Sequence, residues 1–265
     1  MANIHPSAIV DAKAELDSAV EVGAFAMIGP HVRIGEGSVI HPFAQVVGHT
    51  TLGARNIVHS HCVIGGPPQD KKYNHEPTRV EIGSDNTFRE CVTVNSGTVQ
   101  DAGVTRIGSQ NWIMAYVHIA HDCQIGNNTI MANATQIGGH VQVGDWAILG
   151  GITGVHQFVK IGAHAMTAAG TTLTQDLPPY VMASGNPAAA HGINSEGLKR
   201  RGFTEAQIAC IKRAYRLLYK SGSSLEQTAL DLRDRAATGA QSQSEHDSVL
   251  LLADFLKAVS RGIVR

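Results

Sequence analysis

An aliphatic residue recurs at every sixth position along roughly the first two thirds of the chain, with polar or small residues between. A first series runs from Ile4 to Ile64 without a gap, and a second runs from Ile107 to Leu173 with Thr167 as its one polar member. A period of six fits neither an α-helix nor a simple strand alternation. It predicts short strands that each point an apolar side chain inward, separated by turns where glycine accepts backbone angles that other residues resist.

Fixed six-residue periods are typical of parallel β-helices. Three hexads would close one triangular coil of eighteen residues, and successive coils would stack about 4.8 Å apart, as neighbouring strands do. The pattern assigns residues 1–190 to one elongated β-helix and leaves 191–265 as a C-terminal α-helical domain. The chain is therefore predicted to be mainly β.

Two breaks interrupt the repeat. The first spans residues near 66–80, where Asp70 stands at a position expected to be aliphatic; the flanking Ile64 and Ile82 are eighteen residues apart, the length of one coil. The second falls near 96–106 and shifts the phase of the repeat by one residue. Both segments read as loops. They are either ordinary loop tips or functional insertions, which solenoids often carry on one face.

The last part of the chain has a helical pattern. Thr204 and Gln207 have the spacing of a helix-capping box. Residues 199–220 hold seven cationic side chains and one carboxylate, a net charge of +6. This segment is either a solvated helix face or a docking surface for an acidic partner or for phosphates. Two apolar stripes predict helix packing: Ile208, Ile211, Tyr215 and Leu218, and then Val249, Leu252, Leu256 and Val259.

Composition narrows the class of protein. The 265 residues carry a net charge of −1, which gives no general reason to expect nucleic acid as a partner. The N-terminal segment lacks the basic and apolar regions of a signal peptide, and no stretch is long enough to span a bilayer. The four cysteines show no metal-type or disulfide-framework spacing. We therefore expect a cytoplasmic protein.

Residues His118–Cys123 place two histidines, a carboxylate and a thiol within one hexad. In an eighteen-residue coil His121 lies beneath Gly139, and Asp122 lies beneath His140. Several polar side chains thus gather at one corner of the prism, although a chain with 14 histidines can show some clustering by chance. Those within roughly 10 Å of height are His118, His121, His140, His156 and Gln157.

Three chemistries could use this corner. His121 could act as a general base on a hydroxyl, with the Gly139 N–H free to stabilise an oxyanion. The histidines could hold zinc, but the spacing of His118 and His121 differs from that of zinc-dependent β-helix enzymes, so no metal site is predicted. Cys123 could be a nucleophile, but other coils have a packing residue there. Asp122 is kept as a catalytic candidate with its role open, because strand neighbours point to opposite faces except where a corner breaks the alternation.

Five motifs make a family resemblance specific. They resemble the acyl-[acyl-carrier-protein]–UDP-N-acetylglucosamine O-acyltransferases, which are hexapeptide-repeat acyltransferases, and the similarity covers nearly the whole chain. The resemblance implies a left-handed parallel β-helix and a homotrimer with sites between subunits. The motifs are His118–Cys123, Gln69–Tyr73, Gly138–His140, Val155–Phe158 and Asn194–Phe203.

The resemblance implies transfer of an (R)-3-hydroxyacyl group from acyl carrier protein to the 3-hydroxyl of UDP-N-acetylglucosamine, the first step of lipid A synthesis. No cofactor is implied, because the acyl donor is carried on the phosphopantetheine of acyl carrier protein. The basic tail would receive the acidic carrier protein. Neither nucleic acid nor a membrane span is implied.

Site residues carry over motif by motif. His121 would be the general base and the Gly139 N–H would stabilise the oxyanion. The sugar would be held by Gln69, Asp70 and Lys72, and His118, His140, His156 and Gln157 would line the site. Asn194, Glu196, Arg200 and Arg201 would contact uridine and phosphate, and Met166 and Ala169 would bound the acyl chain.

The chain departs from the family pattern at two positions. Ser96 stands before Gly97 and Thr98 where an arginine is expected, which affects contacts from the second loop. Ala169 stands where some relatives have glycine, and its methyl group is predicted to shorten the acyl groove.

Three rival functions differ in what they require. A later N-acyltransferase of the same pathway should carry an extra N-terminal uridine-binding domain, and this repeat begins at Ile4. An acetyl-CoA-dependent hexapeptide acetyltransferase would not need the uridine-type motif in the tail. A β-helix without acyl transfer, such as a γ-carbonic-anhydrase-like protein, would be supported by stoichiometric zinc in the purified protein.

Overall fold

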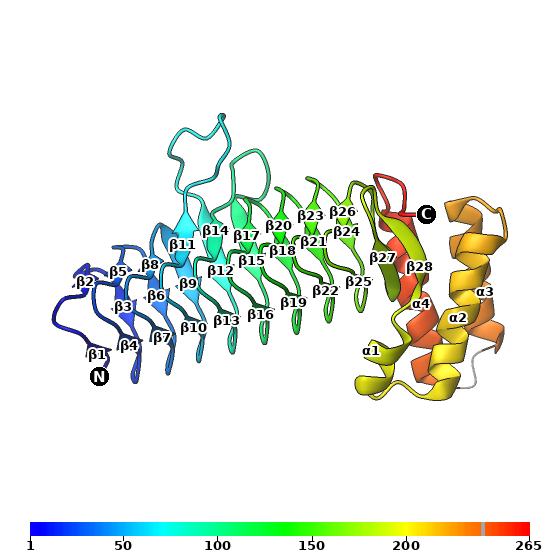
Figure 1. The fold of residues 1–265 in the computed structure, drawn as a ribbon, viewed down its shortest axis with the longest axis horizontal. Helices are drawn as coiled ribbons and strands as arrows, with labels where there is room; N and C mark the ends of the chain where they lie inside the picture. Colours follow the sequence, from blue (N-terminus) through cyan, green and yellow to red (C-terminus); the bar gives the residue numbers. More distant parts are fainter. Residues whose placement is uncertain (240–241) are drawn as a thin grey trace.

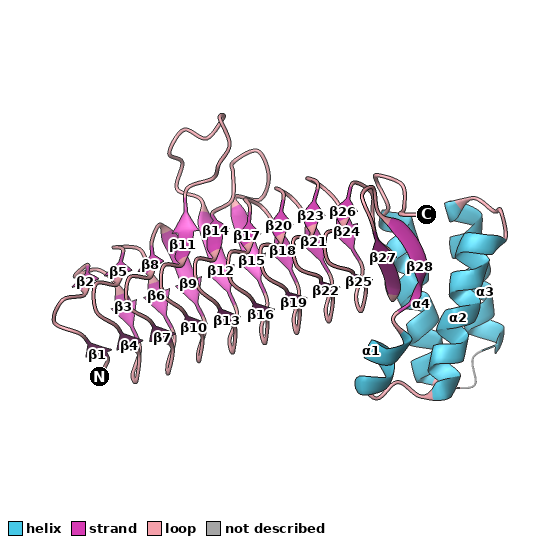
Figure 2. Cartoon of the chain, in the orientation of Figure 1, coloured by secondary structure: helices cyan, strands magenta, loops and turns pink. Residues whose placement is uncertain are grey.

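The computed structural model describes residues 1–239 and 242–265. An elongated three-sided prism of short strands is followed by a bundle of helices at its C-terminal end, and two loops project from the middle of the prism (Figure 1). The strands run parallel in three sheets (Figure 2), as a left-handed parallel β-helix, except that the last strand of the first sheet, β28, pairs antiparallel with β27. The predicted fold class is confirmed.

The three sheets are the three faces of the prism, and each turn of the chain adds one strand to each. The first sheet contains β1 (Asn3–Ile4), β4 (Glu21–Val22), β7 (Val39–Ile40), β10 (Ile57–Val58), β13 (Thr87–Phe88), β16 (Trp112–Ile113), β19 (Ile130–Met131), β22 (Ile148–Leu149), β25 (Met166–Thr167), β27 (Val181–Ser184) and β28 (Ala189–Ile193). The second contains β2 (Ile9–Val10), β5 (Met27–Ile28), β8 (Gln45–Val46), β11 (Val63–Gly66), β14 (Thr93–Asn95), β17 (His118–Ile119), β20 (Gln136–Ile137), β23 (Gly154–Val155) and β26 (Thr172–Leu173). The third contains β3 (Glu15–Leu16), β6 (Arg33–Ile34), β9 (His49–Leu52), β12 (Arg79–Ile82), β15 (Val104–Ile107), β18 (Gln124–Ile125), β21 (Gln142–Val143) and β24 (Lys160–Ile161).

The aliphatic residue of each hexad fills the interior of the prism, as the repeat predicts. Val22, Ile64 and Ile137 are each at most 3 % exposed, and the small residue two positions earlier in each hexad is usually buried as well. The first coil is the exception, because no coil lies beneath it to cover its side chains. Ile4 there is 43 % exposed.

The backbone conformation at the corners of the prism explains how the chain turns sharply from one face to the next. The turns between faces contain a residue in the left-handed backbone region, and many of these residues are not glycine; Asp122, His140 and Phe158 have φ of 60°, 61° and 67°. Such a conformation is uncommon outside glycine, and it recurs here because parallel strand pairing above and below holds each corner.

The two loops lie between β11 and β12 and between β14 and β15. Ile82 pairs with Leu52 in the third sheet, whereas Ile64 belongs to the second, so these two isoleucines do not stack although eighteen residues separate them. The spacing that looked like one coil is an ordinary step of six plus a twelve-residue insertion. This corrects the interpretation from spacing alone, which could not tell a complete coil from a corner insertion.

The C-terminal end of the prism is closed by the chain that follows it. The buried Asp176 carboxylate accepts hydrogen bonds from the backbone N–H groups of Lys160 and Ser260, and its own backbone pairs with Gly262 and Val264. The last residues of the chain thus cover the C-terminal end of the β-helix.

Four helices follow the strands. Thr204 and Gln207 form the predicted capping box, with each side chain bonded to the other's backbone N–H. β28 runs across the boundary predicted at residue 190, since it pairs with β27 before the first helix begins. Within the described residues, no helix is both long enough and apolar enough to cross a membrane. The helices are α1 (Ser195–Arg200), α2 (Glu205–Lys220), α3 (Leu225–Gly239) and α4 (Gln243–Ala258).

Candidate functional site

The histidine motif lies at the corner between the second and third sheets, where the chain passes from β17 to β18. Both projecting loops leave the prism at this same corner, one and two coils toward the N-terminus. Because Asp122 has a left-handed backbone conformation, the strand alternation fails here and its carboxylate lies beside the imidazole of His121. The role of Asp122 that the sequence left open thus has a geometric answer.

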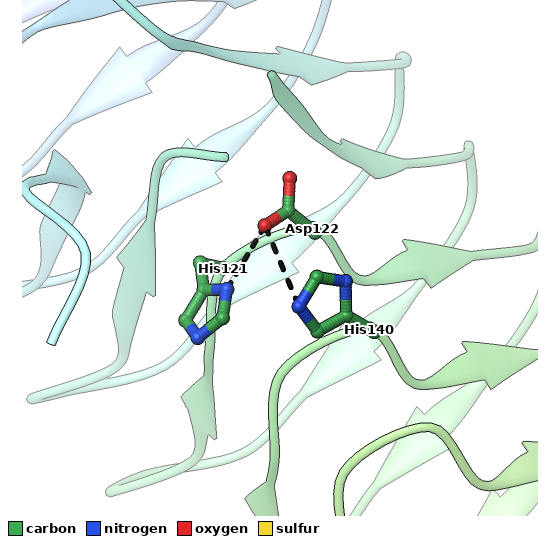
Figure 3. A group of neighbouring side chains, drawn as sticks. All are labelled: His121, Asp122 and His140. Atoms are coloured by element: carbon green, nitrogen blue, oxygen red, sulfur yellow. Dashed lines mark hydrogen bonds and ion pairs between the residues drawn. The ribbon is translucent and has the colours of Figure 1, made fainter. Parts of the chain in front are cut away.

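His121 and Asp122 form a buried pair (Figure 3). The distance from His121 Nδ1 to the Asp122 carboxylate oxygen is 2.9 Å, and the two residues are 7 % and 3 % exposed. The carboxylate also accepts hydrogen bonds from the backbone N–H and the hydroxyl of Thr98, at 2.7–3.1 Å. Since a carboxylate only accepts, the pair places the proton on Nδ1 and leaves Nε2 of His121 as the basic nitrogen.

The environment keeps Asp122 ionised. Burial raises the pKa of its carboxyl, but the hydrogen bonds from His121 and Thr98 outweigh burial and hold the pKa below its ordinary value. An ionised carboxylate at Nδ1 stabilises the imidazolium that forms when Nε2 takes a proton. This geometry is the one that a general base and an orienting carboxylate would need.

Gly139 lies against the ring of His121, one coil above it. A Cβ built on Gly139 would come 2.6 Å from His121 Cε1 and 2.7 Å from Nε2, so only glycine fits there without moving the imidazole. In the described part of the chain, no acceptor takes the Gly139 N–H. This leaves a backbone donor beside the basic nitrogen, as an oxyanion site requires.

Two adjoining clefts open beside His121. The first, of about 720 Å³, is lined by the tip of the first loop, by the second loop, and by His121, His140, Gln157 and Phe158. The second, of about 450 Å³, is lined by His118, His121, Gly139, His156 and Gln157, together with Gln69. The structure therefore brings the predicted lining residues together around the imidazole of His121.

His118 and His140 differ in their partners. His118 Nδ1 lies 2.8 Å from the Thr93 hydroxyl, and burial, followed by the charge of His121, lowers its pKa. The His140 ring stacks on Phe158 and meets the His121 ring edge-on at 5.0 Å. Both histidines line the clefts, and neither belongs to the buried core.

The first loop brings Gln69, Asp70 and Lys72 to the first cleft. Asp70 also accepts a hydrogen bond from the backbone N–H of Lys72, which shapes the loop tip. Ser96, where an arginine was expected, is 4 % exposed and its hydroxyl lies 3.1 Å from that of Thr78. Ser96 therefore joins the bases of the two loops and does not reach into either cleft.

The motif predicted to bind the nucleotide, Asn194–Phe203, lies at a different corner, between the third and first sheets, where Asn194 and Arg201 bond to His164. Asn194 caps α1 by accepting the backbone N–H of Gly197, while Glu196 and Arg200 are exposed. Arg201 donates to His164 Nδ1 at 3.0 Å and lies over the Trp146 ring at 5.3 Å. In the described part of the chain, none of these four tail residues lines the clefts beside His121.

Met166 and Ala169 are also outside those clefts. Met166 lies at an outward position of the first sheet and Ala169 is exposed in the turn after β25. Met166 belongs to an apolar column on the outer surface of that sheet, in contrast to the charged outer surface of the third sheet. The column consists of Val39, Ile57, Trp112, Ile130, Ile148, Met166 and Met182, with the polar Thr87 between Ile57 and Trp112.

A titration prediction follows from the packing of His164. Its ring is stacked between Trp146 and Tyr180, and burial, followed by the charge of Arg201, lowers its pKa to about 4. An unfolded chain protonates this histidine near pH 6.5, so the unfolded state binds the proton first as the pH falls. We expect the free energy of unfolding to drop between about pH 6.5 and 4, by about 1–2 kcal/mol from this residue after allowing for solvent screening.

Denaturant unfolding at pH 7 and at pH 4.5, at one protein concentration, would measure this. The His164→Gln variant keeps an acceptor for Arg201 but cannot titrate, so its stability should fall less over the same interval. Parallel losses in the two proteins would contradict the assignment.

Two further chemistries of this corner have structural counterarguments. Cys123 is fully buried, its thiol donates to the Gly138 carbonyl, and burial raises its pKa to about 12, which disfavours the thiolate that a nucleophile needs. His121, Asp122 and His140 offer ligand atoms within 4.8 Å of one another. A metal bound by these atoms would have to displace the hydrogen bond between His121 and Asp122. The Asp122 carboxylate also already accepts a hydrogen bond from Thr98.

Thr98 and Asp101 are functional candidates that the sequence did not reveal. Thr98 holds the Asp122 carboxylate and Asp101 lies 2.7 Å from His140. The break in the repeat marked their loop, but no spacing rule relates a loop residue to a side chain twenty or more positions away. Only the folded corner brings them together.

Comparison with known proteins gives a consistent picture. Residues 176–264 match the family described as Udp N-acetylglucosamine O-acyltransferase, domain 2, and residues 31–66 and 105–139 match the bacterial transferase hexapeptide repeat. The chain is 53 % identical to the acyl-[acyl-carrier-protein]–UDP-N-acetylglucosamine O-acyltransferase of Herminiimonas arsenicoxydans and 55 % identical to that of Janthinobacterium sp. (strain Marseille), in each case over 100 % of both chains.

Solved structures agree. The UDP-N-acetylglucosamine O-acyltransferase of Moraxella catarrhalis superposes with a TM-score of 0.95 at 38 % identity, and LpxA of Acinetobacter baumannii with a TM-score of 0.93 at 41 % identity. Each comparison covers 99 % of both chains. The similarity therefore includes the β-helix and the helical tail together.

Proposed function

The chain belongs to the family of acyl-[acyl-carrier-protein]–UDP-N-acetylglucosamine O-acyltransferases, and we propose that His121 is the general base of its acyl transfer. The reaction moves an (R)-3-hydroxyacyl group from acyl carrier protein to the 3-hydroxyl of UDP-N-acetylglucosamine and is the first step of lipid A biosynthesis. The observation that carries the assignment of the base is the buried His121–Asp122 hydrogen bond beside the unpaired Gly139 N–H.

The catalytic steps follow from this geometry. Nε2 of His121 removes the proton of the sugar hydroxyl as its oxygen attacks the thioester carbonyl carbon. The negative charge that develops on the carbonyl oxygen is stabilised by the Gly139 N–H. When the intermediate collapses, the carbon–sulfur bond breaks and the imidazolium returns its proton to the leaving thiolate. Asp122 holds the ring and stabilises its charged form throughout.

We assign sugar binding to the first cleft and its loop. Gln69, Asp70 and Lys72 supply hydrogen-bonding and charged groups at the cleft rim. His118, His140, His156 and Gln157 line the two clefts around the reacting atoms. The mechanism needs no resident cofactor and no metal, because the acyl group arrives as a thioester on the phosphopantetheine of acyl carrier protein.

We further propose that the complete site forms between two subunits of a homotrimer. The base and the nucleotide motif lie at different corners of one prism, so one chain does not bring both to one ligand. The apolar column on the outer surface of the first sheet, which includes Met166, supports burial of that face by a second copy and by the acyl chain. Glu196 and Arg200 of one subunit, with Asn194 and Arg201 behind them, would then face His121 of the next.

The basic segment of the helical tail suits the carrier protein. Six of the seven cationic side chains in residues 199–220 are exposed on α1 and α2, whereas Arg201 is half-buried, so most of the positive charge of this segment faces solvent. An acidic carrier protein would be attracted by this surface. We place the reaction in the cytoplasm, which is consistent with the four free thiols.

Mixed trimers test the composite site. His121→Ala and Arg200→Ala should each be nearly inactive alone in transfer from an (R)-3-hydroxyacyl carrier protein to UDP-N-acetylglucosamine. Trimers reassembled from an equal mixture should regain about a quarter of the wild-type sites, because some sites then pair an intact histidine with an intact arginine from the neighbour.

Two results would count against the proposal in different ways. No transfer by the wild-type protein with any acyl length would overturn the function. Active wild type with no recovery in mixed trimers, confirmed to contain both variants, would place the base and the arginine in the same subunit's site.

A further inference from the structure

We propose that Asp101, in the second loop, is a positioning residue that holds the imidazole of His140 in one tautomer at the wall of the substrate cleft. The carboxylate of Asp101 lies 2.7 Å from His140 Nδ1, although the two residues are 39 positions apart. The inference rests on the proposed function of the cleft and concerns how its wall is built.

The carboxylate of Asp101 is itself held in place. Its other oxygen accepts the backbone N–H of Ala102, and the Asp101 backbone N–H donates to the Thr98 carbonyl. Thr98 in turn holds Asp122 through its backbone N–H and hydroxyl. One short loop is thus attached both to the carboxylate behind the base and to the histidine beside it.

The His140 ring has little freedom apart from its choice of tautomer and ring flip. It stacks on Phe158 with ring centroids 4.4 Å apart and meets the His121 ring edge-on. Its Nε2 lies 3.9 Å from the Asp122 carboxylate, too far for a hydrogen bond. The other charged groups facing this cleft are Asp70, Lys71 and Lys72.

The hydrogen bond made by one ring nitrogen determines which nitrogen carries the proton. Because the Asp101 carboxylate can only accept a hydrogen bond, the neutral His140 ring carries its proton on Nδ1. Nε2 then faces the cleft, beside the His121–Asp122 pair, as a hydrogen-bond acceptor. Without Asp101 the His140 ring could flip or change tautomer. It would then no longer present one fixed hydrogen-bonding nitrogen to a bound sugar. Asp101 therefore acts on substrate binding through His140, without contacting the reacting atoms.

Nitrogen NMR of histidine-labelled protein tests the tautomer directly. The His140 signals should report protonated Nδ1 in the wild type and in Asp101→Asn, whose amide oxygen still accepts. In Asp101→Ala they should shift toward protonated Nε2 or an average of the two forms. An unchanged Nδ1–H signal in Asp101→Ala would overturn the proposal, whatever the activity.

Kinetics separate positioning from loss of structure. We expect Asp101→Ala to raise KM for UDP-N-acetylglucosamine roughly five- to twentyfold with kcat nearly unchanged, and Asp101→Asn to restore most of the KM. Val99→Ala is the matched control, since Val99 is in the same loop, is 55 % exposed and lines neither cleft. A KM equal to wild type in Asp101→Ala, or an equal rise in Val99→Ala, would contradict the inference. A wild-type enzyme inactive with every acyl donor would instead overturn the proposed function.

Discussion

Replacing His121 with asparagine is expected to lower kcat by about two to four orders of magnitude while leaving KM for UDP-N-acetylglucosamine little changed. The asparagine amide can still donate to Asp122, as Nδ1 of His121 does at 2.9 Å, so the buried carboxylate keeps its partner. What the variant lacks is the basic nitrogen at the position of Nε2. Steady-state transfer from an (R)-3-hydroxyacyl carrier protein would measure the effect.

The His121→Ala variant provides the comparison. It should lose activity to a similar extent, but it also leaves the Asp122 carboxylate without one of its hydrogen bonds in a buried position, so its unfolding temperature should be lower than that of His121→Asn. If the His121→Asn variant had the same kcat as the wild type, His121 would not be the base. Equal unfolding temperatures for the two variants would show that the pair contributes little to stability.

Gly139→Ala is expected to lower kcat/KM about a hundredfold or more. The new methyl group would come 2.6–2.7 Å from Cε1 and Nε2 of His121, closer than real side-chain contacts allow. The ring cannot move away without lengthening its bond to Asp122, and the methyl group also narrows the approach of an oxyanion to the Gly139 N–H. The same assay would measure the loss, with an unfolding curve to check the fold.

Gly29→Ala is the matched control for this substitution. Gly29 follows a hexad isoleucine in an N-terminal coil, and a Cβ there would meet its nearest neighbour at 3.4 Å, an ordinary contact. We expect it to retain wild-type activity. Wild-type kcat/KM in Gly139→Ala would show that neither the ring position nor the backbone donor matters at this point.

The repeat was sufficient to predict the architecture because it reports a local requirement. Each hexad needs one inward aliphatic residue whatever the rest of the chain does, so residues such as Val22 and Ile137 identify the interior directly. The same logic stacked His121 under Gly139 correctly, since pairing of β17 with β20 preserves a spacing of eighteen. The Ile64–Ile82 spacing misled for the opposite reason. An insertion at a corner changes the register between coils, and the number of residues alone cannot show it.

The sequence by itself determined the β-helix, the helical tail, the positions of both loops and the gathering of histidines at one corner. The tertiary structure alone decided how those groups are paired. The left-handed turn at Asp122 directs its carboxylate to His121, and two loop residues, Thr98 and Asp101, reach that corner through contacts that no periodicity encodes. The tertiary structure also separated the tail motif around Asn194 from His121, because which corner a residue occupies depends on the accumulated register of all the coils before it.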